Sequence, residues 1–201
     1  MSGVEGADAT GSVRQETGPA PDTAAIASAV VAGLIDRFNA WLVDVAGGTE
    51  APFASDELVV FFSKRANDLV NKWLQNSRLV VLSPLSPNKT GVIVIPRERI
   101  EHVYISRSNK DKLGNAEILE ILVQLFAMGS PKFAPNPSPG RAHQLVMFDA
   151  GYTSKSQSVA GESPCAILQF HAHPFSHFRL ETAYWVRPAK LRALTDTALK
   201  K

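Results

Sequence analysis

The chain has little that would mark a secreted, membrane or nucleic-acid-binding protein. Its single cysteine, Cys165, excludes an internal disulfide and fits a reducing compartment. The 21 basic residues nearly balance the 19 acidic ones, which leaves a net charge of +2 and no strong field to attract nucleic acid. No signal peptide is recognisable, and the longest apolar-rich run, Ile26 to Val45, is interrupted by Asp36 and Arg37. We therefore expect a soluble, cytoplasmic protein with no membrane partner.

The first 21 residues lack large apolar side chains, apart from Val4 and Val13. Such a segment cannot offset the entropy cost of ordering by burying apolar surface, so we predict a disordered N-terminal tail over residues 1–21. The remaining length suits one domain with a sizeable core, which needs no disulfide or structural metal ion for its stability. We predict a single α+β domain over residues 22–201.

Two apolar stripes with helical spacing follow the tail. The first runs from Ile26 to Val45, after a potential cap at Asp22, and glycines supply its stop. The second begins at Ser55 and continues to Leu74, with acidic residues in its first turn. Because the connection between them is short, the sequence predicts an N-terminal αα-hairpin.

Short β-branched runs then replace the helical spacing and predict three strands, over residues 78–85, 90–96 and 100–106. The next segment, 116–128, is a helix that Asn115 would cap, and it has only a narrow polar strip. Such a helix is covered on nearly all sides, either within the monomer or by a partner. The 4 prolines within residues 131–141 indicate an extended loop and not a strand.

The C-terminal part reads as a strand over 142–151, a polar loop over 151–164 that is a candidate flap, a hairpin over 165–186, and a final helix from Pro188. The predicted order is αα-βββ-α-βββ-α, an α+β fold with a mostly antiparallel sheet of about six strands, one central and one C-terminal helix, and helices mainly on one face. This element order resembles that of the class I type III secretion chaperones. The resemblance implies a protein that acts by binding.

The hairpin carries the strongest candidate for chemistry. His171 and His173 lie two residues apart on one predicted strand, so their side chains share a face, and His177 follows across the turn. Three histidines in this arrangement are suited to bind zinc. The alternative is that they end a strand, half buried, with hydrogen bonds to the loop backbone.

The tetrapeptide His171-Ala172-His173-Pro174 resembles the HxHP core of the JAMM metalloprotease motif, which implies a metal-dependent hydrolase. The residues after Pro174 do not supply the serine and aspartate of that motif. A zinc-bound water would also need a general base, and Glu181 and Glu162 are the nearest carboxylates in sequence.

Two further groups of residues have both a functional and a plain interpretation. Cys165 beside a histidine could act as a nucleophile, but its place after Pro164 favours a small buried apolar residue. The basic residues Arg187, Lys190 and Arg192 follow Tyr184 and Trp185, a combination that can bind single-stranded nucleic acid, although a plain surface helix is the favoured interpretation.

Since no catalytic set is complete and the helix over 116–128 is unusually apolar, we predict first a non-catalytic binding or assembly protein. It would self-associate as a homo-oligomer or join a larger protein complex, in a chaperone-like role or as a structural particle component. The alternatives are a metal-dependent hydrolase that uses His171, His173 and His177, and a nucleic-acid-binding protein that uses Arg187, Lys190 and Arg192.

Overall fold

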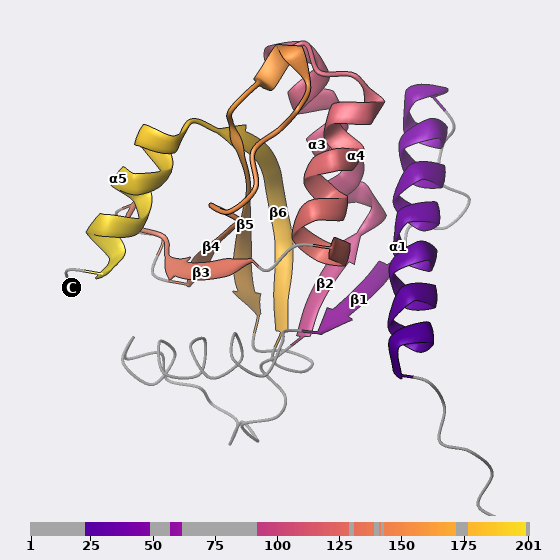
Figure 1. The fold of residues 1–201 in the computed structure, drawn as a ribbon, viewed down its shortest axis with the longest axis horizontal. Helices are drawn as coiled ribbons and strands as arrows, with labels where there is room; N and C mark the ends of the chain where they lie inside the picture. The colour runs from indigo at the N-terminus through magenta and orange to yellow at the C-terminus, as the bar shows by residue number, and fades with distance from the viewer. Residues whose placement is uncertain are drawn as a thin grey trace, which may run out of the picture.

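The computed structural model describes residues 23–48, 57–61, 92–128, 131–138, 141, 143–171 and 177–199. Within them, four α-helices and a six-stranded mixed sheet form an α+β fold (Figure 1). The helices are α1 (Thr23–Ala46), α3 (Arg97–Lys110), α4 (Asn115–Val123), which continues as the π-helix η1 (Gln124–Met128), the short 3-10 helix η2 (Gln157–Val159), and α5 (Pro188–Leu199). The strands are β1 (Glu57–Phe61), β2 (Val92–Pro96), β3 (Lys132–Pro135), β4 (Gln144–Phe148), β5 (Ser163–His171) and β6 (His177–Val186).

The sheet has the strand order β1-β2-β6-β5-β4-β3. Every neighbouring pair is antiparallel except β2 and β6, which run parallel. The predicted hairpin of β5 and β6 is confirmed and lies in the middle of the sheet. The histidine-containing segment is therefore central to the fold, and among the described strands β1 and β3 form the two edges.

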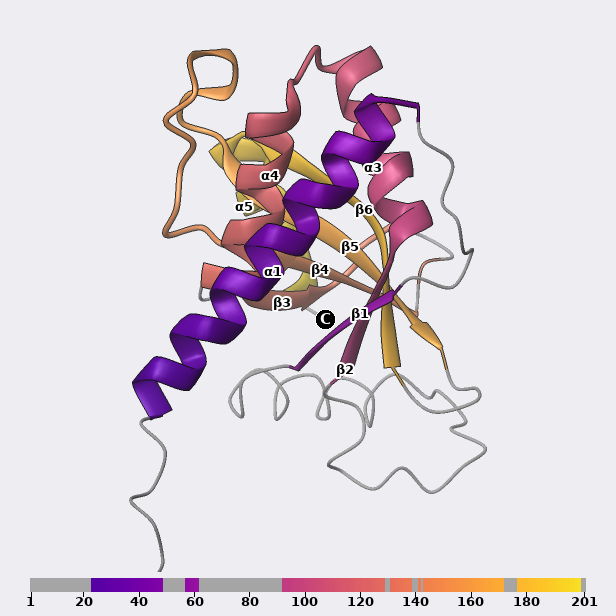
Figure 2. The ribbon, with the colours of Figure 1, turned by 90° about the vertical axis from the view of Figure 1, so that its right-hand side faces the viewer.

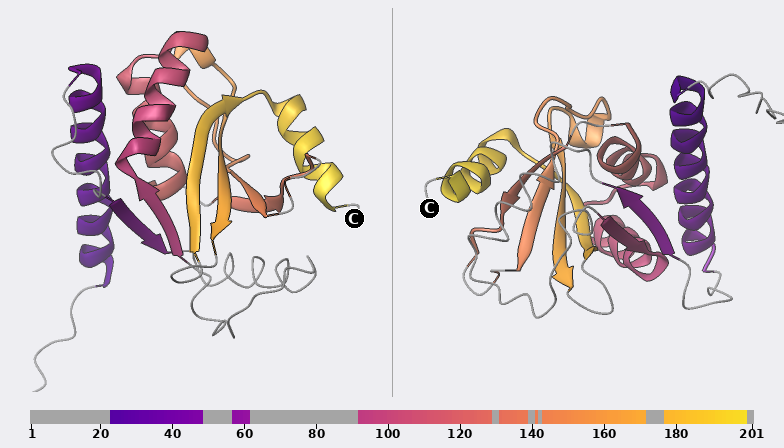
Figure 3. Two further views of the ribbon diagram at one scale, coloured as in Figure 1. Left: turned by 180° about the vertical axis from the view of Figure 1, so that it is seen from behind. Right: turned by 90° about the horizontal axis from the view of Figure 1, so that it is seen from below.

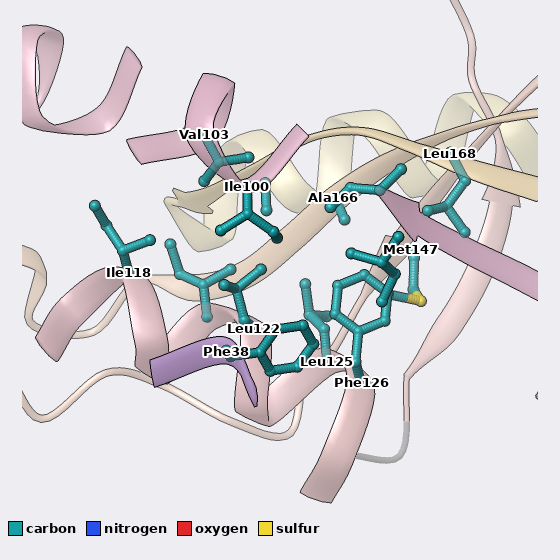
Figure 4. Packing of buried hydrophobic residues seen from close by; sticks show 14 of the residues in the cluster. Phe38, Ile100, Val103, Ile118, Leu122, Leu125, Phe126, Met147, Ala166 and Leu168 are labelled. Carbon is teal, nitrogen blue, oxygen red and sulfur yellow. The ribbon is translucent and has the colours of Figure 1, made fainter. Parts of the chain in front are cut away.

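The helices cover the two faces of the sheet unequally. Figures 1 and 3 show α3 and α4 on one face, with α1 packed outside them, whereas α5 lies against the opposite face. We call these the helical face and the α5 face. The core of the helical face is closely packed, and Figure 4 shows Phe38 of α1 beside Phe126 of η1, their ring centroids 6.2 Å apart. The prediction of helices mainly on one face is confirmed.

A bulge in β6 changes which residues face the core. The register shifts between Ile167 and Leu168 of β5, and it leaves Glu181 as the extra residue on β6. Before the bulge, Phe178 and Leu180 are buried against the helical face; after it, Ala183 and Trp185 are. Glu181 and Thr182 are therefore both displaced from the core side of the strand.

The first predicted helix is confirmed as α1, although Asp22, its predicted cap, lies outside the described residues. Gly48 ends the helix with a φ of +70°, a conformation that glycine adopts without steric cost. The amide of Gly47 donates to the carbonyl of Val43 at 2.9 Å and closes the last turn. None of the helices within the described residues has the length and apolar character needed to cross a bilayer.

The predicted second helix, Ser55 to Leu74, is wrong where the structure describes it, since Glu57–Phe61 forms β1. Val59, Val60 and Phe61 are β-branched or aromatic residues that suit a pleated surface, and pairing with β2 outweighs the helical spacing. The predicted αα-hairpin is therefore not formed by the described residues. The rest of that helix, the strand over 78–85 and the N-terminal tail lie outside the described residues.

The strand predicted over 100–106 is also wrong, because these residues belong to α3. Ile100 and Val103 are fully buried at a spacing of three, and the helix begins directly after Pro96. Glu98 in the first turn and Lys110 in the last turn both interact favourably with the helix dipole and stabilise the helix. The strong β-propensity of the segment is overridden by these helical contacts.

The proline-rich segment 131–141 was predicted to be a loop, but Lys132–Pro135 pairs with β4 as the edge strand β3. Proline is tolerated there because an edge strand leaves some amide groups unpaired. The predictions of β2, β4, α4 and α5 are confirmed, with α4 capped at Gly114 and not at Asn115. Because the order of elements differs from αα-βββ-α-βββ-α, the resemblance to the secretion chaperones loses its basis.

Candidate functional site

Two of the three hairpin histidines lie directly opposite each other. His171 ends β5 and His177 begins β6, and the register pairs them. Their rings are stacked, with centroids 5.3 Å apart and planes inclined by 16°. Burial lowers the pKa of His171, and the neighbouring His177 and Arg179 lower it further. The neutral form of this histidine is therefore favoured.

This geometry gives limited support to the predicted zinc site. A tetrahedral zinc ion needs ligand lone pairs that converge on one point, whereas the in-plane lone pairs of stacked rings lie in nearly parallel planes and do not converge. Within the described part of the chain, no group of three or more His, Cys, Asp or Glu side chains could hold a metal ion. His173 lies outside the described residues, so the three-histidine site of His171, His173 and His177 stays a prediction.

Two arginines approach the histidine pair from different elements. Arg179 of β6 donates from Nη2 to Oε1 of Glu98 at 2.8 Å, and the same nitrogen lies 3.9 Å from Oε1 of Glu57. Arg99 of α3 places Nη1 at 3.3 Å from Oε2 of Glu181, the bulged residue of β6. The bulged residue of β6 thus forms an ion pair with the first turn of α3.

We call His171, His177, Arg99, Arg179, Glu57, Glu98 and Glu181 the ion-pair cluster. Its three carboxylates outnumber its two guanidinium groups, and each arginine already contacts a carboxylate. The cluster therefore has no excess positive charge to attract an anionic substrate. Its arrangement is that of side chains which stabilise one another at the junction of β1, β6 and α3.

The basic residues predicted to bind nucleic acid do not share a surface with two aromatic rings. Arg187 and Arg192 are exposed, and Arg187 lies 3.4 Å from the carboxylate of Glu162. The Nζ atom of Lys190 lies 5.9 Å from the ring centroid of Tyr184, on the α5 face. Trp185 points to the helical face instead, where it is buried and donates to the carbonyl of Glu117. The predicted stacking surface is therefore missing one of its two rings.

Cys165 is a buried residue of the sheet core, as predicted. Burial raises the pKa of its thiol to about 12, so the reactive thiolate is scarce at neutral pH. Its neighbours on the α5 face include the apolar side chains of Phe148, Val186 and Leu191, together with the Tyr184 side chain, with which it forms a hydrogen bond. A nucleophilic role for this thiol is disfavoured.

One group of interacting residues was not predicted from the sequence. The loop that follows β4, which the sequence predicts to be a flap, is held to α4 by hydrogen bonds to two glutamates of that helix. Tyr152 and Ser154 donate to the carboxylate of Glu120 at 2.8 and 3.0 Å, and Ser156 donates to Glu117 at 2.9 Å. The bond to Glu120 raises the pKa of Tyr152 to about 12. These contacts hold the loop against the domain.

Only part of the ion-pair cluster could be predicted from the sequence. The polar residues His177, Arg179 and Glu181 alternate with apolar ones, which is the pattern of a strand with one polar face. This pattern indicates the polar face of β6. The contribution of Arg99, however, depends on α3, for which the sequence predicts a strand. With this geometry established, no protein-family model, curated protein or solved structure matches the chain.

Proposed function

We propose that the chain is a non-catalytic binding or assembly protein that self-associates or joins a larger protein complex. The observation that supports this proposal most strongly is the first half of α1. From Thr23 to Ile35 the sequence contains no charged residue. Its described side chains are mostly exposed, and Val30 is 58% exposed. A helix segment without a polar face is typical of one that is covered by a partner.

The two halves of α1 differ in what they contact. Phe38, Trp41 and Leu42, in the second half, are buried in the core of the helical face. The first half runs beyond the other described elements, as Figure 2 shows. Val43 adds a second large apolar side chain, 56% exposed, to the outer surface of the same helix. Apolar surface of this kind gains roughly 25 cal/mol per Å² when a partner buries it.

The chemistry of the described residues fits the same proposal. Cys165 is buried as a thiol, and each arginine of the ion-pair cluster contacts a carboxylate. A cytoplasmic setting is part of the proposal, since a lone thiol needs no oxidising compartment. Chaperone-like and structural particle roles both remain within this class, because each requires an apolar surface that a partner covers.

The proposal is tested by sedimentation velocity on the full chain from about 1 µM to about 300 µM. We expect association that increases with concentration and that weakens at least about tenfold in the double variant Val30→Asp/Val43→Asp. Ile105→Asp is the matched control, since it places the same charge at an exposed apolar position of α3. Association that the α1 double variant leaves unchanged would remove the main support for the proposal.

A metal-dependent hydrolase is the second candidate, and one observation favours it. His171 and His177 face each other across the hairpin, so two of the three predicted ligands are adjacent. A third ligand would have to come from His173. The zinc content of the full chain decides between the two candidates.

A further inference from the structure

We propose that the outer edge of β1 pairs antiparallel with β1 of a second copy of this chain, so that two sheets join across a two-fold axis. This inference rests on the proposed function and adds to α1 a second surface at which two copies of the chain meet.

The two sheet edges are protected to different degrees. β3 is bounded by Pro131 and Pro135 and begins with Lys132, and prolines and lysines are the residues with which proteins prevent edge-to-edge pairing. β1 contains neither, and Glu57 at its start is its one charged residue. Within the described part of the chain, β1 pairs with β2 alone. Of the two edges, β1 is therefore the one suited to accept another strand.

The exposed side chain of β1 is apolar. Leu58 and Val60 pack against the core of the helical face, whereas Val59 points to the other side and is 51% exposed. Its partner on β2, Val94, is buried. An apolar side chain left exposed at the centre of an unprotected edge strand is typical of a strand-pairing surface.

The residue pattern of β1 fits a second copy of itself. Antiparallel pairing centred on Val59 places Val59 opposite its own copy, Leu58 opposite Val60, and Glu57 opposite Phe61. The two Glu57 side chains then lie about 13 Å apart along the strands, beyond the screening length of about 8 Å in physiological salt. Parallel pairing would instead bring the two glutamates side by side. The antiparallel arrangement is also the one that a two-fold axis generates.

Two variants of the full chain test this pairing. Val59→Lys places a charge at the proposed two-fold axis, and we expect it to weaken self-association at least about tenfold in sedimentation velocity. Ile105→Lys is the matched control and is expected to associate like the wild type. Val59→Cys is expected to form a disulfide-linked dimer under mild oxidation, because each new thiol would face its own copy. Cys165 is buried, and Ile105→Cys, at an exposed position of α3, serves as the control for random cross-linking.

The outcomes separate this inference from the proposed function. If Val59→Lys associates like the wild type while Val30→Asp/Val43→Asp does not, self-association runs through α1 and the β1 pairing is wrong. A Val59→Cys chain that cross-links no faster than Ile105→Cys would overturn the pairing as well. A wild-type chain that stays monomeric at every concentration would contradict the inference and the self-association on which it rests.

Discussion

The central strands β5 and β6 present different chemistry to the two sides of the sheet. On the helical face their side chains are apolar and almost completely buried, as for Ala166, Leu168, Phe178 and Leu180. On the other side the same strands split into two halves. One half packs under Leu191 of α5 with Cys165 and Val186, and the other half carries the ion-pair cluster.

This difference shows where the stability of the fold resides. Apolar burial on the helical face contributes in proportion to area, with about 1.5–3 kcal/mol for each large side chain. Ion pairs in the cluster must first compensate for lost hydration, so their net contribution is small even though removing one partner is costly. We therefore expect substitutions on the helical face to have much larger effects on stability than substitutions in the cluster.

The largest effect is expected for Phe178→Ala. Phe178 is fully buried on the helical face, and its ring lies 5.4 Å from that of Phe170. The substitution leaves a cavity and should lower the free energy of unfolding by about 3–5 kcal/mol in urea denaturation. Phe178→Leu retains most of the volume and should cost less than about 1.5 kcal/mol. Equal losses from the two variants would show that this side of the sheet is not closely packed.

A smaller loss is expected for Glu181→Gln in the ion-pair cluster. Its side chain is 20% exposed and its carboxylate lies beside Arg99, which would keep only the longer contact with Glu98. We expect a loss of about 1–2 kcal/mol in the same denaturation experiment. Arg187→Gln is the control, because that arginine is 84% exposed in its pair with Glu162 and should cost less than about 0.5 kcal/mol. Similar values for the two pairs would mean that the cluster is as solvated as the ordinary surface.

The smallest effect concerns pH and His171. The pKa of this residue is lowered from 6.5, so the folded chain binds fewer protons there than the unfolded chain. The free energy of unfolding should therefore decrease as the pH falls through about 6.5, and His171→Gln should show a shallower decrease. Urea denaturation at a series of pH values measures both slopes. Identical slopes would mean that the ring is not desolvated by the hairpin.

The elements that could be predicted from the sequence are those with a long or unambiguous pattern. The helices α1, α4 and α5 and the hairpin of β5 and β6 have this property. Short β-branched segments were ambiguous, since Glu57–Phe61 and the start of α3 each fit both a helix and a strand. Their outcome depends on pairing with β2 and on burial of Ile100 and Val103, which are long-range contacts.

The candidate site could be predicted in part for the same reason. The adjacency of His171 and His177 follows from a hairpin, which is a local feature. The contacts of Arg99 with Glu181 and of Glu57 with Arg179 depend on α3 and β1, the two elements whose type the sequence did not predict correctly. They also depend on a bulge in β6, which no sequence pattern predicts. The cluster is built from four elements, and of its residues only the histidines could be predicted as a site from the sequence.

The claim that the polar half of this sheet face consists of stabilising ion pairs, and holds no catalytic metal, is tested most directly by elemental analysis for zinc. The full chain and its His171→Ala/His173→Ala variant would be dialysed against zinc-containing buffer, freed of excess metal and compared. We predict clearly substoichiometric zinc in the wild type and no difference between the two chains. About one zinc per wild-type chain, lost in the variant, would contradict the claim and establish the histidine hairpin as a metal site.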